Sequence, residues 1–219
     1  LKEWSPQNIS IKTNPEAIIW AVDGVDDNSV ALAARLMEKG VEVRIIDKEA
    51  LLSKQTLSRG SIAVLAMDNP EYEDLSETVN SIATDLDISV LSIESGFGAE
   101  ELPDWGGRHF RLLERPQIAI LSQSGFSSYD VGVSWWSLDH HLGIRHSQID
   151  ASLVNYADLR RYNTIILPSG YRDMGEYEKK VLSDWMEQGG TLIANAASSF
   201  TLASEPVSYT HLTLPTTML

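Results

Sequence analysis

The sequence has no cysteine, and this absence removes several kinds of chemistry at once. Without Cys, the 219 residues form no disulfide, no thiolate zinc site and no cysteine nucleophile. The longest apolar runs reach only about five or six residues, whereas a helix needs about 20 to cross a bilayer, so we expect no membrane span. No basic segment followed by an apolar one opens the chain, so no export signal is visible.

Positive charge is also scarce. The chain has 17 Lys and Arg against 31 Asp and Glu, a net charge of −14. Residues 1–105 hold 20 acidic and 8 basic side chains, and residues 106–206 hold 11 and 9. Because such a surface repels phosphate, we expect no nucleic-acid partner. The 43% hydrophobic content, with six Trp, is enough for a packed core in one large domain or two small ones.

Both ends of the chain differ from the rest. When residues 207–216, VSYTHLTLPT, are reverse-translated, the DNA matches a transposase mosaic end that runs into a sequencing-library adapter. We therefore expect residues 207–219 to be a non-native tail. Residues 1–16 begin without Met and are typical of an internal linker. We therefore expect the chain to be a fragment of a longer protein.

The first half alternates predicted strands with predicted helices. Four apolar segments rich in β-branched residues predict buried strands: 17–22, 41–46, 61–66 and 88–93. Asp27, Asn28 and Ser29 are candidate N-caps of a helix that ends at Gly40. Two helical stripes lie between the strands: Val30, Ala33, Ala34 and Met37, then Leu75, Val79, Ile82, Ala83 and Leu86. This alternation predicts right-handed crossovers and a parallel sheet.

A second α/β half follows a glycine-rich connector at residues 94–110. We place the boundary at residue 105, with one half at 17–105 and the other at 106–206. The second half has predicted strands at 118–121, 144–149, 164–167 and 191–194. Its helical stripes are Val131, Trp135, Leu138 and Leu142, then Tyr177, Val181, Leu182 and Trp185.

Neither a metal site nor a nucleophile stands out. None of the five His begins an H-x-x-E or H-E-x-x-H pattern, and the adjacent His140 and His141 point in different directions on a helix. Ser124 and Ser169 each follow a predicted strand, but neither has the glycine pair of a G-x-S-x-G turn. Capping or solvated loop serines are therefore the favoured interpretation.

A ligand site at the carboxyl ends of the strands is a further hypothesis. It uses the loops 122–128, 169–173 and 196–199, because free N–H groups before a helix bind anions. Trp135 lies on the predicted core stripe, so only Trp136 is expected at the surface, where it contacts a neighbouring domain or a ligand. The candidate ligand-binding residues are Ser124, Gly125, Trp136, Ser169, Tyr171 and Arg172. The simpler alternative is that Ser127 or Ser128 caps the helix.

Three stretches carry a family resemblance: GGRHFRLLERPQIAILSQSGFSSYDVGVSWWSLDHHLGI, ADLRRYNTIILPSGY and GGTLIANAAS. They resemble the C-terminal region of large bacterial zinc carboxypeptidases related to carboxypeptidase A, in which a class I glutamine amidotransferase-like domain follows the peptidase domain. The resemblance implies a flavodoxin-like α/β fold, with a parallel sheet and helices on both faces, in two α/β halves. Active amidotransferases have a Cys at a strand-to-helix elbow, whereas residues 194–198 here read ANAAS.

The missing Cys decides the expected function. An elbow without a nucleophile forms no glutaminyl thioester, so the resemblance implies a non-catalytic accessory region that packs on an upstream peptidase domain. That absent domain would hold the zinc and act on a peptide, and the family implies a secreted or periplasmic bacterial protein. Two alternatives remain: a binding module for a carbohydrate or carboxylate, and a degenerate serine hydrolase that uses Ser124 or Ser169. The hydrolase needs an imidazole within hydrogen-bond reach of one hydroxyl.

Overall fold

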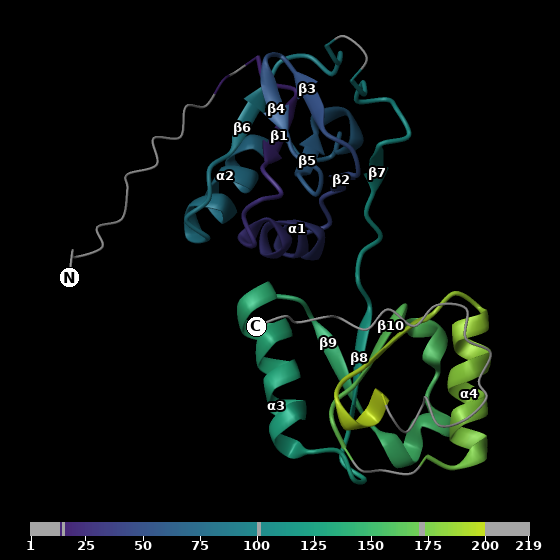
Figure 1. Cartoon of the computed structure of the whole chain (residues 1–219). Coiled ribbons are helices and arrows are strands. Elements are labelled where there is room, and N and C mark those ends of the chain that lie inside the picture. The colour runs from purple at the N-terminus through teal and green to yellow at the C-terminus, as the bar shows by residue number, and fades with distance from the viewer. Residues whose placement is uncertain (1–13, 15, 100–101, 171–173, 200–219) are drawn as a thin grey trace. The chain divides into compact units, whose positions relative to one another are not determined.

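The computed structural model describes residue 14 and residues 16–99, 102–170 and 174–199, in two compact units (Figure 1). The first unit extends to Arg115 and includes His140–Ile144; the second comprises Pro116–Asp139 and the chain from Arg145 onward. Strand β7 (Phe110–Leu112) pairs with β2 (Arg44–Ile46), so the first unit continues past residue 105, where the sequence analysis placed the boundary.

The first unit is built on a five-stranded antiparallel sheet, and here the prediction of a parallel sheet is wrong. Its strand order is β6-β1-β5-β2-β7, with β1 at Ile19–Val22, β5 at Ile62–Leu65 and β6 at Leu91–Ile93. All four neighbouring pairs are antiparallel.

The reason for the difference lies in how the crossovers skip a strand. Helix α1 (Asn28–Glu38) joins β1 to β2, but β5 lies between them; α2 (Leu75–Asp85) joins β5 to β6, but β1 lies between them. This is a split β-α-β arrangement. A hairpin of β3 (Ala50–Leu52) and β4 (Gln55–Leu57) turns the chain between β2 and β5.

The inner strands β1 and β5 are buried along their whole length, as their composition predicts, whereas β2, β6 and β7 are partly exposed. Trp20 and Val22 of β1 belong to a core that includes residues of α1 and α2. Ile19 and Ala21 point to the other face, where residues of the hairpin and Trp105 complete a second core. In Figure 1 both helices lie together on one side of this sheet.

The helical stripes of the first unit are confirmed in part. Ala33, Ala34 and Met37 of α1 are buried, but Val30, placed on the same stripe, is 59% exposed. Gly40 has a φ of +90°, the left-handed conformation that ends a helix, as its position predicts.

The second unit contains the parallel sheet that the sequence predicts. Its order is β11-β10-β8-β9, with β8 at Ile118–Ser122, β9 at His146–Asp150, β10 at Thr164–Leu167 and β11 at Thr191–Ala194. Helix α3 (Ser128–Trp136) contacts β8, and α4 (Glu176–Glu187) packs with Leu182 and Trp185 in the core of the opposite face. Figure 1 shows α3 and α4 on the two sides of this sheet.

The prediction that Trp135 lies in the core is wrong. Trp135 is 43% exposed and Trp136 is 53% exposed, and of the predicted stripe only Leu138 is buried. After α3 the chain continues as a π-helical segment, Ser137–Leu142. A π-helix is wider than an α-helix, so a stripe drawn at one constant period does not stay on one face. In α4, Tyr177 also departs from its predicted stripe and is 65% exposed.

Candidate functional site

The loops at the carboxyl ends of the parallel strands form the candidate site of the second unit. After β8, three consecutive residues have left-handed backbones: Gln123 at φ 58°, Ser124 at 44° and Gly125 at 96°. A left-handed non-glycine residue costs roughly 1–2 kcal/mol, so this turn holds strain. Such strain clusters at functional sites, although it is not itself evidence of one.

Ser124 is held by a carboxylate from the next strand. Its hydroxyl donates to Asp150 Oδ1 at 2.8 Å. The same oxygen accepts from the Ser152 backbone N–H at 2.9 Å and from the Ser152 hydroxyl at 2.8 Å, which makes Asp150 the N-cap of the 3₁₀ segment Ala151–Tyr156. Sequence reasoning missed this role of Asp150, which the pattern Asp-x-Ser after a strand could have indicated.

The loops after β8 and β10 are joined backbone to backbone. The Ser127 N–H donates to the Ser169 carbonyl at 2.9 Å, and Phe126 and Gly170 form an isolated β-bridge. A Cβ placed on Gly170 would lie 2.8 Å from the Gly125 carbonyl oxygen, closer than real Cβ atoms come to backbone. Main chain therefore joins the two loops beyond the carboxyl ends of β8 and β10, the position at which ligands bind in open α/β sheets.

The helix after the first loop has the cap that the simpler interpretation predicts. Ser127 is extended, and its hydroxyl accepts from the Asp130 N–H at 3.3 Å. The hydroxyl thus satisfies one of the free donors at the start of α3, as an N-cap does. This leaves fewer free N–H groups for an anion.

The predicted site residues are brought together only in part. Ser124, Gly125 and Ser169 lie in the two joined loops, whereas Trp136 ends α3, about 12 Å along the helix from its start. Tyr171 and Arg172 lie outside the described residues. His146 begins β9, at the opposite end of the sheet from these loops.

The turn after β11 leads from a strand into a helical turn through one left-handed residue. The Asn195 N–H still donates to the Leu167 carbonyl of β10, at 2.9 Å, and residues 197–199 are helical. Between strand and helix stands Ala196, with a φ of 44° and an exposed side chain. In a nucleophile elbow the reactive residue occupies such a strained strand-to-helix turn. Local sequence gives no sign of this backbone, because alanine rarely adopts it.

Ser198, two residues after Ala196, faces inward. Ser198 is 5% exposed, and its hydroxyl donates to the Pro168 carbonyl at 2.6 Å. This bond ties the elbow to the loop after β10. Ser198 therefore stabilises the turn, and its hydroxyl is engaged with backbone.

In the first unit, a small charged cluster lies where β2 ends and β7 begins. His109 Nδ1 donates to Asp47 Oδ1 at 2.7 Å, and Arg111 Nε lies 3.4 Å from the other carboxylate oxygen. The hydrogen bond from His109 lowers the pKa of Asp47 below its ordinary value, and the positive charge of Arg111 acts in the same direction. The cluster links two neighbouring strands.

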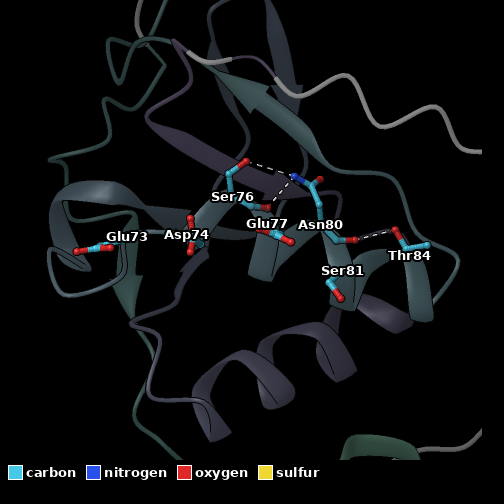
Figure 2. A pocket seen from close by; sticks show the side chains of 7 residues that line it. All are labelled: Glu73, Asp74, Ser76, Glu77, Asn80, Ser81 and Thr84. Carbon is cyan, nitrogen blue, oxygen red and sulfur yellow. Dashed lines mark hydrogen bonds between the residues drawn. The ribbon is translucent and has the colours of Figure 1, made fainter.

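A shallow hollow of about 550 Å³ lies along α2, shown in Figure 2. It is lined by acidic and small polar side chains: Glu73, Asp74, Ser76, Glu77, Asn80, Ser81 and Thr84. Asn80 Nδ2 donates to the Ser76 carbonyl at 2.7 Å, and the Thr84 hydroxyl donates to the Asn80 carbonyl at 2.7 Å, so these groups bond to their own helix.

Within the residues that the structure describes, no three or more His, Asp or Glu side chains are placed to hold a metal ion. Over the same residues, every helix is too short or too polar to cross a bilayer, in line with the expectation of no membrane span.

Comparison with known proteins gives little. No family model matches the chain, and no curated protein matches it. One solved structure aligns with it, an acyl carrier protein S-malonyltransferase from Vibrio cholerae O1 biovar eltor, at 12% sequence identity and a TM-score of 0.21. The alignment covers 88% of this chain and 60% of that one. A superposition of this quality assigns neither a fold nor an activity.

Proposed function

We propose that the chain is a non-catalytic accessory region of a bacterial zinc carboxypeptidase-like protein, whose second unit is a degenerate, flavodoxin-like glutamine amidotransferase domain. The observation that carries the proposal is Ala196, a methyl side chain at a left-handed strand-to-helix turn. The strand order β9-β8-β10-β11 agrees with it, because flavodoxin-like sheets have the order 2-1-3-4-5. On this proposal, Ala196 stands where an active amidotransferase would have its nucleophile.

Chemistry then belongs to an upstream peptidase domain. That domain would bind the zinc ion, which supplies a metal-activated water for removing a C-terminal residue from a peptide. The present chain would pack against that domain and stabilise it. The joined loops after β8 and β10 support a packing role, because their backbones bond to each other at the position where open α/β sheets bind ligands.

The gene upstream of Leu1 tests the parentage. An in-frame H-x-x-E zinc motif there is the expected result. A start codon directly before Leu1 would dismiss the accessory role. Assays of the purified chain for peptidase and glutaminase turnover complete this test, with no turnover expected from either.

The elbow can be tested without any partner, because the chain has no cysteine of its own. In the variant Ala196→Cys, the thiol stands before a helical turn, so its alkylation should titrate below the ordinary thiol pKa of about 8.5. Val25→Cys, at a 78% exposed loop position beside Asp23 and Asp26, is the control and should titrate at or above that value. Equal midpoints would show that the turn does not activate a nucleophile.

A second candidate, a module that binds a carboxylate or carbohydrate, is favoured by one observation. The strained turn at Gln123–Gly125 presents Ser124 against the carboxylate of Asp150. Isothermal titration with simple sugars and dicarboxylates tests it. Binding that is lost in Ser124→Ala would favour this module over the accessory role.

A further inference from the structure

The helical stretch that begins with α3 starts in the second unit and ends in the first. Its residues up to Asp139 belong to the second unit, whereas His140–Ile144 belong to the first. The boundary therefore falls inside the π-helical segment Ser137–Leu142. Because π-helical turns are rare and frequently mark functional positions, this crossing is a candidate for a conformational role.

At its start, in the second unit, the stretch is weakly anchored. None of the nine residues of α3, all of which the structure describes, is buried. The hydroxyls of Ser134 and Ser137 donate to the helix carbonyls four residues before them, each at 2.9 Å, and such bonds slightly destabilise a helix. Since a helix this short gains most of its stability from packing, α3 depends on contacts beyond its own turns.

At its end, in the first unit, the stretch is held by α1. Arg35, in the last turn of α1, donates from Nη2 to the His141 carbonyl at 3.1 Å. Basic side chains commonly satisfy the last carbonyls of a helix in this way. Gly143 then has a left-handed φ of 69°, and a Cβ there would lie 3.3 Å from Arg35 Cγ. Seven of the eleven residues of α1 are buried, so Arg35 extends from a firmly packed helix.

We propose that the first unit controls the order of α3: the bond from Arg35 to the His141 carbonyl holds the helix, and α3 opens locally when this bond is lost. The start of α3 is capped by Ser127 and directly follows the strained turn at residues 123–125. Opening of the helix therefore also loosens the loop after β8. A change at α1 reaches that loop through α3. This inference rests neither on the accessory role nor on ligand binding by the loop.

Hydrogen exchange on the full chain tests the proposal. Arg35→Ala should lower the protection of the α3 amides at residues 131–136 by about three- to tenfold, because a hydrogen bond is lost, while β8 and β10 keep their protection. Lys39→Ala is the matched control, since it removes a positive charge from the same end of α1 and leaves the bond to His141 in place. It should not change α3. Equal protection of α3 in the two variants would overturn the proposal, as would a loss that β8 shares in full.

Two glycines give a second pair of variants. Gly143→Ala forces a side chain into a left-handed backbone and against Arg35, so it should lower the protection of α3 over the same range. Gly189→Ala is the matched control: its φ is 103°, it follows α4, and a Cβ there meets nothing within 4 Å. It should affect α4 and leave α3 unchanged. An α3 as protected in Gly143→Ala as in the parent chain would show that the helix needs no anchor in the first unit.

Discussion

Gly170 shows at the scale of one residue how tightly the loops of the second unit are joined. A Cβ at this position would lie 2.8 Å from the Gly125 carbonyl oxygen and 2.9 Å from Phe126 Cα, both of which are backbone atoms. Backbone moves only if the whole loop moves, so the bridge between the two loops depends on the missing side chain. The serines beside it are held in place by the same bridge.

Gly170→Ala should therefore lower the free energy of unfolding of the second unit by about 1–3 kcal/mol, the usual cost of overpacking. Gly132→Ala is the matched control, because a Cβ there meets nothing within 4 Å and the residue lies inside α3. This control should raise the free energy of unfolding by about 0.5–1 kcal/mol. Urea unfolding followed by circular dichroism measures both, and two effects of the same sign would contradict the description of the loop.

Asp47 gives a pH-dependent prediction. Its pKa is lowered in the folded state by the hydrogen bond from His109, and Arg111 contributes. A carboxyl with a lowered pKa stabilises the fold above its unfolded pKa of about 3.9, and this contribution is lost as the pH falls through the folded value. Asp47→Asn should therefore be less stable than the parent chain at neutral pH.

The difference in free energy of unfolding between the parent chain and Asp47→Asn should become smaller in acid. Urea unfolding of the two chains at neutral pH and well below the ordinary carboxyl pKa tests this, with Glu49→Gln, at an exposed carboxylate, as the control. A gap between the parent chain and Asp47→Asn that is as wide in acid as at neutral pH would assign the effect to packing instead of charge.

At the scale of elements, most strands and helices could be placed from the sequence, but β3, β4 and β7 were missed, and the pairing of the strands was predicted only in part. Strands at 164–167 and 191–194 are confirmed to the residue, because hydrophobic run length and flanking turns are local properties. Strand direction in the first unit depends on β5 inserting between β1 and β2, a long-range choice that the hairpin at Ser53 and Lys54 makes possible.

In the candidate site, too, the features set by local sequence could be predicted and those set by long-range contacts could not. Ser124, Gly125 and Ser169 could be placed at strand ends from the sequence, because loops after parallel strands gather at one edge. The partner of Ser124 could not be predicted, because Asp150 comes from a neighbouring strand. The left-handed backbone of Ala196 could not be predicted either, because tertiary structure imposes it against the preference of alanine. The exposure of Trp135 was missed because no residue of α3 is fully buried, and periodicity alone does not show how deeply a helix is covered.

Two buried tryptophans give a matched pair at this scale. Trp185 of α4 is 6% exposed, and its Nε1 donates to the carbonyls of Leu159 at 3.1 Å and Tyr162 at 3.2 Å, which ties the helix to the 3₁₀ turn Leu159–Arg161. Trp105 is 8% exposed, and among the described residues its Nε1 has no hydrogen-bond partner.

Replacing each tryptophan by Phe should separate the contribution of the hydrogen bonds to stability from that of the lost side-chain volume. Trp185→Phe removes the donor that two carbonyl groups share, whereas Trp105→Phe removes a donor that has no partner. Trp185→Phe should therefore lower the free energy of unfolding by about 1–3 kcal/mol more than Trp105→Phe. Chemical denaturation of each variant, followed through the unit that carries it, gives the two values. Equal losses would show that packing alone decides, and that the bonds from Trp185 contribute nothing.

At the scale of the whole molecule, charge is divided unequally. Residues 1–115 carry a net charge of −10 and residues 116–206 a net charge of −4. Like charges on one compact unit repel, and salt screens exposed charges at distances beyond about 10 Å at 0.1 M. Added sodium chloride should therefore stabilise the first unit more than the second. Hydrogen exchange read separately on β1 and on β8 measures the two responses in one sample.

The acidic helix α2 allows this prediction to be made specific. Asp85, exposed in its last turn, faces the negative end of the helix dipole, so Asp85→Asn should stabilise the first unit by about 0.3–1 kcal/mol at low salt and reduce its response to salt. Glu77→Gln makes the same charge change in the first turn, where a carboxylate is favourable, and should give little or no gain. The second unit of each variant is the internal control. Equal salt responses in the two units of the parent chain would show that net charge does not limit the stability of the first.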